Sequence, residues 1–204
     1  MTTRTLAVVS AGLSQPSSTR LLADRLAAAT ADRLREQGDD VVLETVDLRD
    51  LAHDVTNAML TGFPSEALEA AQRAVTGADG LVAVTPIFSA SYSGLFKSFV
   101  DTLEMGSLAG MPVLLGATGG TARHSLALDF ALRPLFAYLR ASVAPTAVFA
   151  ATDDWASAAS NGLGGRITAA GAEFGDLLAG SARRAPADPF ADVVPFERLL
   201  RGEA

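Results

Sequence analysis

The sequence predicts an α/β protein with a three-layer, doubly wound, parallel sheet of five strands in the order 2-1-3-4-5. Five short apolar runs alternate along the chain with segments whose apolar residues recur at helical spacing, which is typical of strands joined by right-handed helical crossovers. The first, third and fourth runs each end in a loop of glycine, serine or threonine. In this strand order the three loops lie together at one edge of the sheet, where open α/β sheets bind ligands.

The first strand is predicted at residues 5–10, an apolar run of the kind that is buried in parallel sheets. After a loop of small and hydroxyl residues comes a helix with Leu22, Leu26 and Leu34 on one face. Gly38 is expected to end this helix, because glycine readily adopts the left-handed backbone that often follows a helix.

The next part of the chain contains a more polar second strand at residues 41–48 and a helix at residues 65–75. Ser65 is expected to cap that helix, since its hydroxyl can accept a hydrogen bond from the first turn, and Gly77 is expected to end it. Residues 50–64, between the two, are predicted to be irregular.

The third strand is predicted at residues 81–84, an apolar run typical of a strand buried on both faces. Residues 85–92 are not expected to continue it, because Pro86 has no N–H and because small and hydroxyl residues surround two aromatic ones. From Gly94 the spacing becomes helical. The apolar residues of this helix are Leu95, Phe96, Phe99, Val100 and Leu103.

The fourth strand is predicted at residues 111–115 and is followed by a glycine-rich loop over residues 116–121. A long helix over residues 125–140 comes next, and Pro134 should kink or divide it. Its core candidates are Phe130, Leu135, Tyr138 and Leu139. Because this helix is apolar around much of its circumference, it needs a second partner besides the sheet, and we expect a homo-oligomer.

The fifth strand is predicted at residues 146–150 and the last helix at residues 166–178. Beyond residue 181 proline and charge increase, which is typical of a tail. The 204 residues therefore divide into one domain, residues 1–180, and a C-terminal tail, residues 181–204.

Composition excludes several classes of protein. A net charge of −7 and a pI near 4.8 argue against nucleic-acid binding, which needs a basic face. The absence of cysteine rules out disulfides, thiolate metal sites and a cysteine nucleophile, and it is compatible with the cytoplasmic location that we expect. We expect no membrane span, because no uncharged apolar run approaches roughly 18 residues, and no targeting segment is recognisable.

Other polar stretches are interpreted as structural. His53 and His124 are the only histidines, too few and too separated for a metal site, and surface positions are expected. Asp153 and Asp154 are more typical of a turn or an N-cap than of a carboxylate pair. A glycine-rich stretch at residues 161–165 favours a flexible loop over a cofactor site.

The loop after the first strand, residues 10–20, is rich in hydroxyl groups. A phosphate monoester could accept hydrogen bonds there from the hydroxyls and from the N–H groups of the first helical turn. Plain helix capping by Ser17 or Ser18 is the alternative. The loop has neither the Gly-Lys-Ser/Thr of a P-loop nor a G-x-G-x-x-G, so nucleotide hydrolysis and dinucleotide binding of the usual kind are disfavoured.

The loop after the third strand could hold a flat polar ring. Its backbone N–H and C=O groups can meet the edge of such a ring, while Phe88 and Tyr92 can lie near its face. On the following helix, Lys97 could contribute to a site, or it could be solvated and form an i,i+4 ion pair with Asp101.

Together these loops resemble those of the NAD(P)H-dependent FMN reductases of the flavodoxin-like superfamily, over about residues 5–150. Three segments carry the resemblance in the order that this family shows: the serine-rich loop at 10–19, the segment 86–94 that begins with proline and precedes a lysine and an aspartate, and the glycine-rich loop 116–120. Leu13 departs from the family pattern, where serine is common, and Phe88 stands where tyrosine is frequent.

The resemblance implies a flavodoxin-like fold, homodimers or homotetramers, and reduction of FMN by NADH or NADPH, with reduced flavin that could serve a monooxygenase. The implied FMN-binding residues are Ser10, Leu13, Ser14, Ser17, Ser18, Thr19, Pro86, Ile87, Phe88, Ser89, Ala90, Ser91, Thr118, Gly119 and Gly120. No catalytic residue is implied, because the flavin and the nicotinamide carry the hydride chemistry. We expect N–H groups of residues 118–120 to stabilise negative charge on the flavin, and Gly119 to require glycine because of a positive φ.

Two alternatives share this fold: a reductase of quinones or azo compounds that keeps its flavin, and an electron carrier of flavodoxin type. The carrier differs because it would not oxidise NAD(P)H rapidly by itself. A signalling receiver domain is disfavoured, since it needs acidic residues where Ser10 and Thr85 stand.

Overall fold

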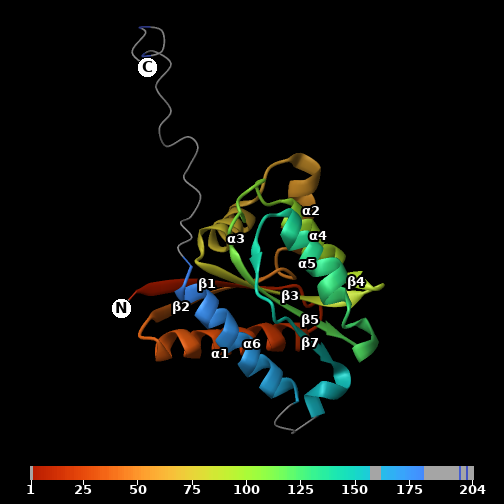
Figure 1. Ribbon diagram of the computed structural model, residues 1–204. Helices are drawn as coiled ribbons and strands as arrows, with labels where there is room; N and C mark the ends of the chain where they lie inside the picture. The colour runs from red at the N-terminus through yellow and green to blue at the C-terminus, as the bar shows by residue number, and fades with distance from the viewer. Residues whose placement is uncertain (1, 157–161, 182–197, 199–200, 202–204) are drawn as a thin grey trace.

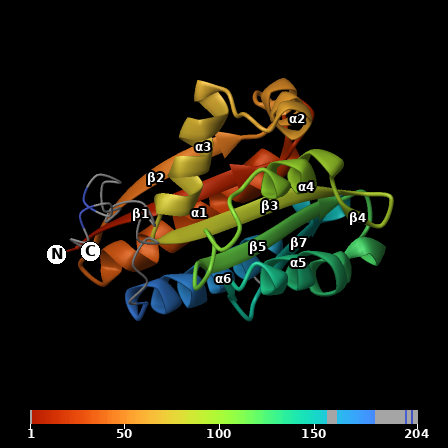
Figure 2. The same cartoon turned by 90° about the horizontal axis from the view of Figure 1, so that it is seen from above.

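The computed structural model describes residues 2–156, 162–181, 198 and 201. Its sheet has the predicted parallel order, with the five main strands arranged β2-β1-β3-β5-β7 (Figures 1 and 2). These strands are β1 (Thr3–Ser10), β2 (Asp40–Asp47), β3 (Gly80–Phe88), β5 (Pro112–Gly119) and β7 (Val148–Ala151). A two-residue strand, β6 (Ser142–Val143), lies beside the start of β5, and β7 lies beside its end.

Helices cover both faces of the sheet and complete the three predicted layers (Figure 1). One face is covered by α1 (Ser18–Glu36) and α6 (Leu163–Ala179). The other face is covered by α2 (Ala52–Thr61), α3 (Glu66–Gly77), α4 (Gly94–Asp101) and α5 (Arg133–Tyr138). The core is therefore double, because successive strand residues point to opposite faces.

Residues of α1 confirm the predicted apolar face. Leu22, Leu26 and Leu34 are fully buried against the sheet and α6. The two helices pack so closely that a Cβ on Gly171 would lie 2.5 Å from the Cβ of Ala29. This contact fixes α1, and with it the start of the helix at the edge of the sheet.

The third strand is longer than predicted, because β3 continues through Pro86 to Phe88. The N–H of Ala11 donates to the carbonyl of Val84 (3.0 Å), so the backbone polar groups of Val84 face β1. Those of Pro86, two residues later, face the same side, but β1 has already ended at Ser10. The missing N–H of proline therefore breaks no ladder bond, and pairing with β5 continues on the other side.

Residues 50–64 are not wholly irregular, since α2 occupies Ala52–Thr61. The sequence gives little sign of it, because Leu51 offers no side-chain cap and only Val55 and Ala58 are buried. Gly62 ends the helix with a φ of 80°. By contrast α3 begins as predicted, with the hydroxyl of Ser65 accepting a hydrogen bond from the next turn.

The predicted helix over residues 125–140 is divided, as Pro134 requires. A short 3₁₀ turn, Ala122–His124, precedes a π-helical segment, Leu128–Leu132, and α5 then begins at Arg133 with Pro134 in its first turn. Proline is tolerated there because the first N–H groups of a helix have no intrahelical partner.

This division changes which side chains are buried. Leu128, Leu132 and Phe136 point into the core, whereas Phe130 is 77% exposed and Tyr138 is 78% exposed. The prediction that Phe130 and Tyr138 belong to the core is therefore wrong, because the wider π turn shifts the helical phase. The other two core candidates, Leu135 and Leu139, are partly buried against the core.

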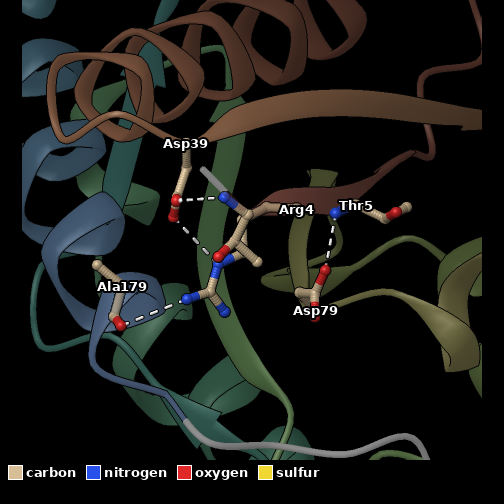
Figure 3. Close-up of polar contacts among 6 residues, drawn as sticks. Arg4, Thr5, Asp39, Asp79 and Ala179 are labelled. Atoms are coloured by element: carbon tan, nitrogen blue, oxygen red, sulfur yellow. Dashed lines mark hydrogen bonds and ion pairs between the residues drawn. The ribbon is translucent and has the colours of Figure 1, made fainter.

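The amino ends of the strands are joined by polar contacts at the edge opposite the predicted site (Figure 3). The guanidinium of Arg4 donates to Asp39 (3.3 Å) and to the carbonyl of Ala179 at the end of α6 (3.4 Å). The N–H of Thr5 donates to the carboxylate of Asp79, which precedes β3 (2.8 Å). These contacts hold β1, β2, β3 and α6 together at that edge.

The last helix begins at Leu163, three residues before the predicted start, so the glycines at 164 and 165 are helical. Of the stretch at 161–165 that was predicted to be a flexible loop, residue 161 lies outside the described residues and Gly162 precedes the helix. The predicted tail, 181–204, also lies almost entirely outside them. Within residues 2–156 and 162–181, no helix combines the length and the apolar character that crossing a membrane requires.

Candidate functional site

A cavity of about 460 Å³ opens at the carboxyl edge of the sheet, where the chain leaves β1, β3, β5 and β7. It lies at the switch point of the doubly wound sheet, between β1 and β3. Its lining residues are Leu13, Ser14, Ser18, Thr19, Pro86, Ile87, Phe88, Thr118, Gly119, Gly120, Ala150, Thr152 and Trp155. The three predicted loops thus lie together around the cavity, and the loop after β7, the fifth main strand, is a fourth part of the lining.

Hydroxyl groups of the first loop form one end of the cavity. Ser14, Ser18 and Thr19 line it, the last two from the first turn of α1. Ser17 does not line it: its hydroxyl accepts a hydrogen bond from the N–H of Arg20 (3.2 Å) and caps the helix. The capping interpretation is confirmed for Ser17, and Ser14, Ser18 and Thr19 remain the candidates for a phosphate site.

Two buried positions support the first loop. A Cβ on Gly12 would overlap the hydroxyl of Ser17, so only glycine lets the loop pass over its own cap. Ser10 ends β1, is fully buried and does not line the cavity. Its hydroxyl has no hydrogen-bond partner among the described residues, which leaves a polar group available beneath the loop.

The end of β3 forms a second wall. Pro86, Ile87 and Phe88 line the cavity, and Phe88 is 48% exposed. The chain then turns back through Ser89 and Ala90 into β4 (Ser91–Tyr92), which pairs antiparallel with β3 (Figure 2). The three residues 89–91 belong to this hairpin and do not line the cavity.

The turn of this hairpin is strained, and hydrogen bonds hold its base. Ser89 and Ala90 have φ values of 48° and 69°, in the left-handed region that a type I′ hairpin turn requires. This conformation costs a residue other than glycine about 1 kcal/mol. Behind the turn, the hydroxyl of Thr85 accepts from the N–H of Ser93 (3.1 Å) and donates to the carbonyl of Pro86 (3.1 Å). The hairpin is thereby held at both ends.

Tyr92 does not face the cavity, contrary to the prediction for this loop. Its ring packs 6.2 Å from that of Phe96, between the hairpin and α4. Lys97 and Asp101 form the predicted i,i+4 ion pair on the exposed side of α4 (2.6 Å), and its hydrogen bond to Asp101 raises the pKa of Lys97. Neither lines the cavity.

Thr118, Gly119 and Gly120 form the third wall, and a buried hydrogen bond ties it to the first. The hydroxyl oxygens of Thr19 and Thr118 are 2.7 Å apart. Gly119 is still within β5 and does not have a positive φ, so that expectation is wrong. Glycine is needed there because a Cβ would lie 2.8 Å from the ring of Phe149.

The fourth wall, at the end of β7, was missed by the sequence analysis. Ala150, Thr152 and Trp155 line the cavity. The rule that ligands bind at the carboxyl ends of strands applies to this strand as well, but its loop lacks the glycine and serine pattern that marks the other three.

The Trp155 loop is held by a small ionic network. The guanidinium of Arg25 lies 5.4 Å from the centre of the Trp155 ring. Asp154 accepts from the N–H of Ala151 (2.8 Å) and pairs with Arg166 (2.9 Å). Partial burial raises the pKa of Asp154, but these two partners outweigh it, and its pKa lies below the usual value. Asp154 therefore stabilises the turn before Trp155, as predicted, and does not form a carboxylate pair with Asp153.

The fold and the cavity define a flavodoxin-like α/β protein with a cavity at the switch point of its sheet. Hydroxyls and a helix start lie at one end of the cavity, and the other walls are uncharged. Comparison with known proteins narrows this class. Residues 4–156 match the NADPH-dependent FMN reductase family, and the chain belongs to that family. It is an oxidoreductase whose family uses FMN with NADH or NADPH.

Individual relatives and solved structures are consistent with this family assignment. The NADH-dependent FMN reductase SfnE of Pseudomonas putida is 37% identical over 148 residues, which cover 72% of this chain and 77% of the relative. The FMN reductase (NADPH) of Pseudomonas aeruginosa is 34% identical and covers 72% and 76%. Among solved structures, an oxidoreductase from Corynebacterium diphtheriae is 45% identical with a TM-score of 0.85, covering 89% of this chain and all of the other. The apo NADH:FMN oxidoreductase EmoB is 30% identical, with a TM-score of 0.75, and covers 93% and 100%.

The residues present fit FMN. Ser14, Ser18, Thr19 and the first N–H groups of α1 offer donors to a phosphate monoester, and no carboxylate lines the cavity to repel it. The other walls are apolar side chains and glycine backbone, which suit a flat ring with polar edges. A volume of about 460 Å³ lies within the usual range of small-molecule sites.

Proposed function

We propose that NADH or NADPH reduces FMN in this cavity. The observation that carries the proposal is the division of one cavity into a hydroxyl end, at the start of α1, and an uncharged end between β3 and β5. This division matches the two chemically different ends of FMN, a phosphate and a tricyclic ring.

Each loop then has a distinct role. Ser14, Ser18 and Thr19 bind the phosphate, and Ser10 supports them from below. Residues 86–88 and 118–120 bind the ring, largely through backbone and apolar contacts. The implied contacts of Ser89, Ala90 and Ser91 become indirect, because these residues shape the hairpin that carries Phe88.

The bound flavin supplies the chemistry, since its ring accepts a hydride from the nicotinamide. The chain has to bind both ligands, orient them and exclude water from the space between them. The backbone N–H groups of Gly119 and Gly120 are candidates for stabilising negative charge on the ring, because they lie where β5 ends at the cavity. No protein acid or base is required.

The direct test follows NADH and NADPH oxidation by the purified protein with FMN added or omitted. We expect oxidation that depends on the protein and saturates with FMN, and riboflavin should be a poorer substrate because it lacks the phosphate. A protein that binds FMN but does not oxidise either nucleotide would be an electron carrier instead. The absorbance spectrum of the purified protein distinguishes flavin that stays bound from flavin that is released.

We further propose that released FMNH₂ serves a flavin-dependent monooxygenase and that the enzyme works in the cytoplasm, where NADH, NADPH and FMN are available. The exposed Leu126, Phe130 and Tyr138 support assembly into a homodimer or homotetramer, because they place three large apolar side chains in solvent within residues 126–138.

A further inference from the structure

The described residues that line the cavity include no positively charged side chain that could bind the phosphates of the nicotinamide nucleotide. A nicotinamide dinucleotide carries a pyrophosphate, and NADPH carries one phosphate more, but no charged side chain is among the lining residues. The chain has a net charge of −7, which repels such an anion over much of the surface. Since the hydroxyl end is assigned to the FMN phosphate, a cation for the nucleotide has to come from the rim.

Several arginines near the cavity already have partners. These pairs are Arg20 with Asp24, Arg25 with the Trp155 ring, and Arg166 with Asp154. Arg20 and Arg166 are held by carboxylates and have to break those contacts before they can bind a phosphate. Arg25 is not held by a carboxylate of the described residues but lies over the face of the Trp155 ring.

Arg123 differs from these arginines. It is exposed, and none of the carboxylates in the described part of the chain pairs with it. It lies three residues after Gly120, which lines the cavity, in the short turn Ala122–His124. That turn packs against β7, whose Ala150 also lines the cavity. The side chain of Arg123 therefore starts at the rim, between the third and fourth walls.

The turn is held in place by Thr121. Its hydroxyl accepts a hydrogen bond from the N–H of Arg123 (3.1 Å) and caps the turn. The backbone of Arg123 is thus fixed relative to Gly120 while its guanidinium stays available. The FMN phosphate end is formed by Ser18 and Thr19 at the start of α1, and Thr19 contacts Thr118 of β5. Arg123 lies five residues beyond Thr118, in the turn that packs against β7.

We propose that Arg123 binds the phosphate groups of the nicotinamide nucleotide. A guanidinium suits this task because its planar fork of donors matches two phosphate oxygens at once. The inference rests on the proposed function, since it deepens the description of the same site. It makes Arg123 a binding residue for the nucleotide and not for FMN.

The experiment compares Arg123→Gln with Arg140→Gln in the full chain. Arg140 is a matched control, because it is also exposed, has no carboxylate partner among the described residues, and lies before β6 at the opposite edge of the sheet. Calorimetry measures binding of ADP-ribose and of its 2′-phosphate, which carry the phosphates without the nicotinamide. Steady-state kinetics give KM for NADH and NADPH, and flavin fluorescence gives the affinity for FMN.

We expect Arg123→Gln to weaken nucleotide binding and raise KM about tenfold, equivalent to about 1.4 kcal/mol, with FMN affinity unchanged and Arg140→Gln like the wild type. If ADP-ribose and its 2′-phosphate lose equal affinity, Arg123 contacts the pyrophosphate. If only the 2′-phosphate form loses affinity, Arg123 contacts the 2′-phosphate. Thr121→Val should give part of the effect, and Thr121→Ser should restore it.

Unchanged nucleotide binding in Arg123→Gln would overturn the inference, and so would a loss confined to FMN or an equal loss in Arg140→Gln. Wild-type protein that fails to oxidise NADH and NADPH with FMN would instead overturn the proposed function. The two failures are therefore distinguishable.

Discussion

The hydroxyl oxygens of Thr19 and Thr118 lie 2.7 Å apart and are both buried, although 99 residues separate them in the chain. One belongs to the first turn of α1 and the other to the end of β5. This hydrogen bond joins the loop assigned to the phosphate to the loop assigned to the ring, so the two ends of the cavity are directly connected.

The first prediction concerns this pair. Thr19→Val or Thr118→Val alone should each lower the free energy of unfolding by about 1–3 kcal/mol, because one buried hydroxyl is left without its partner. The double variant should lose less than the sum of the two. Urea unfolding of the four proteins measures this coupling, and strictly additive losses would show that the two hydroxyls do not interact.

The second prediction separates phosphate binding from helix capping. Ser18→Ala should weaken FMN and leave riboflavin unchanged, because only FMN has the phosphate. Ser17→Ala should instead lower stability by about 1 kcal/mol through the lost cap. Fluorescence titrations with both flavins, together with unfolding curves, test this division. Equal losses of FMN and riboflavin affinity in Ser18→Ala would place the phosphate elsewhere.

The third prediction uses two neighbouring glycines. Gly119→Val should lower the melting temperature even without flavin, because its Cβ would meet the ring of Phe149. Gly120→Val should melt like the wild type, since nothing lies within 4 Å of its Cβ position, yet bind FMN at least tenfold more weakly, about 1.4 kcal/mol. A folded Gly120→Val protein with normal FMN affinity would move the ring away from this loop.

The fourth prediction follows from Asp154. Its pKa in the folded protein is below the usual 3.8, so its stabilising contacts are complete above that value and are lost as the pH falls through the lower, folded value. Trp155 is the only tryptophan and follows directly in the chain. Its fluorescence should therefore change in acid before global unfolding, and Asp154→Asn should show the changed emission already at neutral pH.

The fifth prediction concerns assembly. Phe130→Glu should reduce the molar mass found by light scattering at micromolar concentration, because it places a charge in the proposed interface. Phe63→Glu is the matched control, since Phe63 is 80% exposed and follows α2, a different segment of the chain. A wild-type monomer, or an equal effect of both substitutions, would contradict the proposal.

Much of the fold could be predicted because its signals are local. The apolar run at 81–84, the cap at Ser65 and the face of Leu22, Leu26 and Leu34 each depend on residues close together in sequence. The strand order and the meeting of three loops then follow from topology. Ten of the predicted site residues line the cavity, as these loops converge on it.

The errors come from features that depend on distant neighbours. Pro86 is tolerated within β3 only because β1 ends before it, which its own segment does not reveal. The phase of residues 128–132 depends on a π turn, which hydrophobic spacing does not show. Trp155 is positioned at the cavity by its contact with Arg25, which is distant in sequence, and by the turn that Asp154 stabilises. The sequence around Trp155 predicts only the turn.

The central claim is tested most directly by the crystal structure of the protein with FMN bound. The account predicts the phosphate within hydrogen-bonding distance of Ser18 and Thr19, and the ring between Phe88 and the backbone of residues 118–120. An FMN phosphate bound at any other place, or a ring outside the cavity formed by β1, β3, β5 and β7, would contradict it.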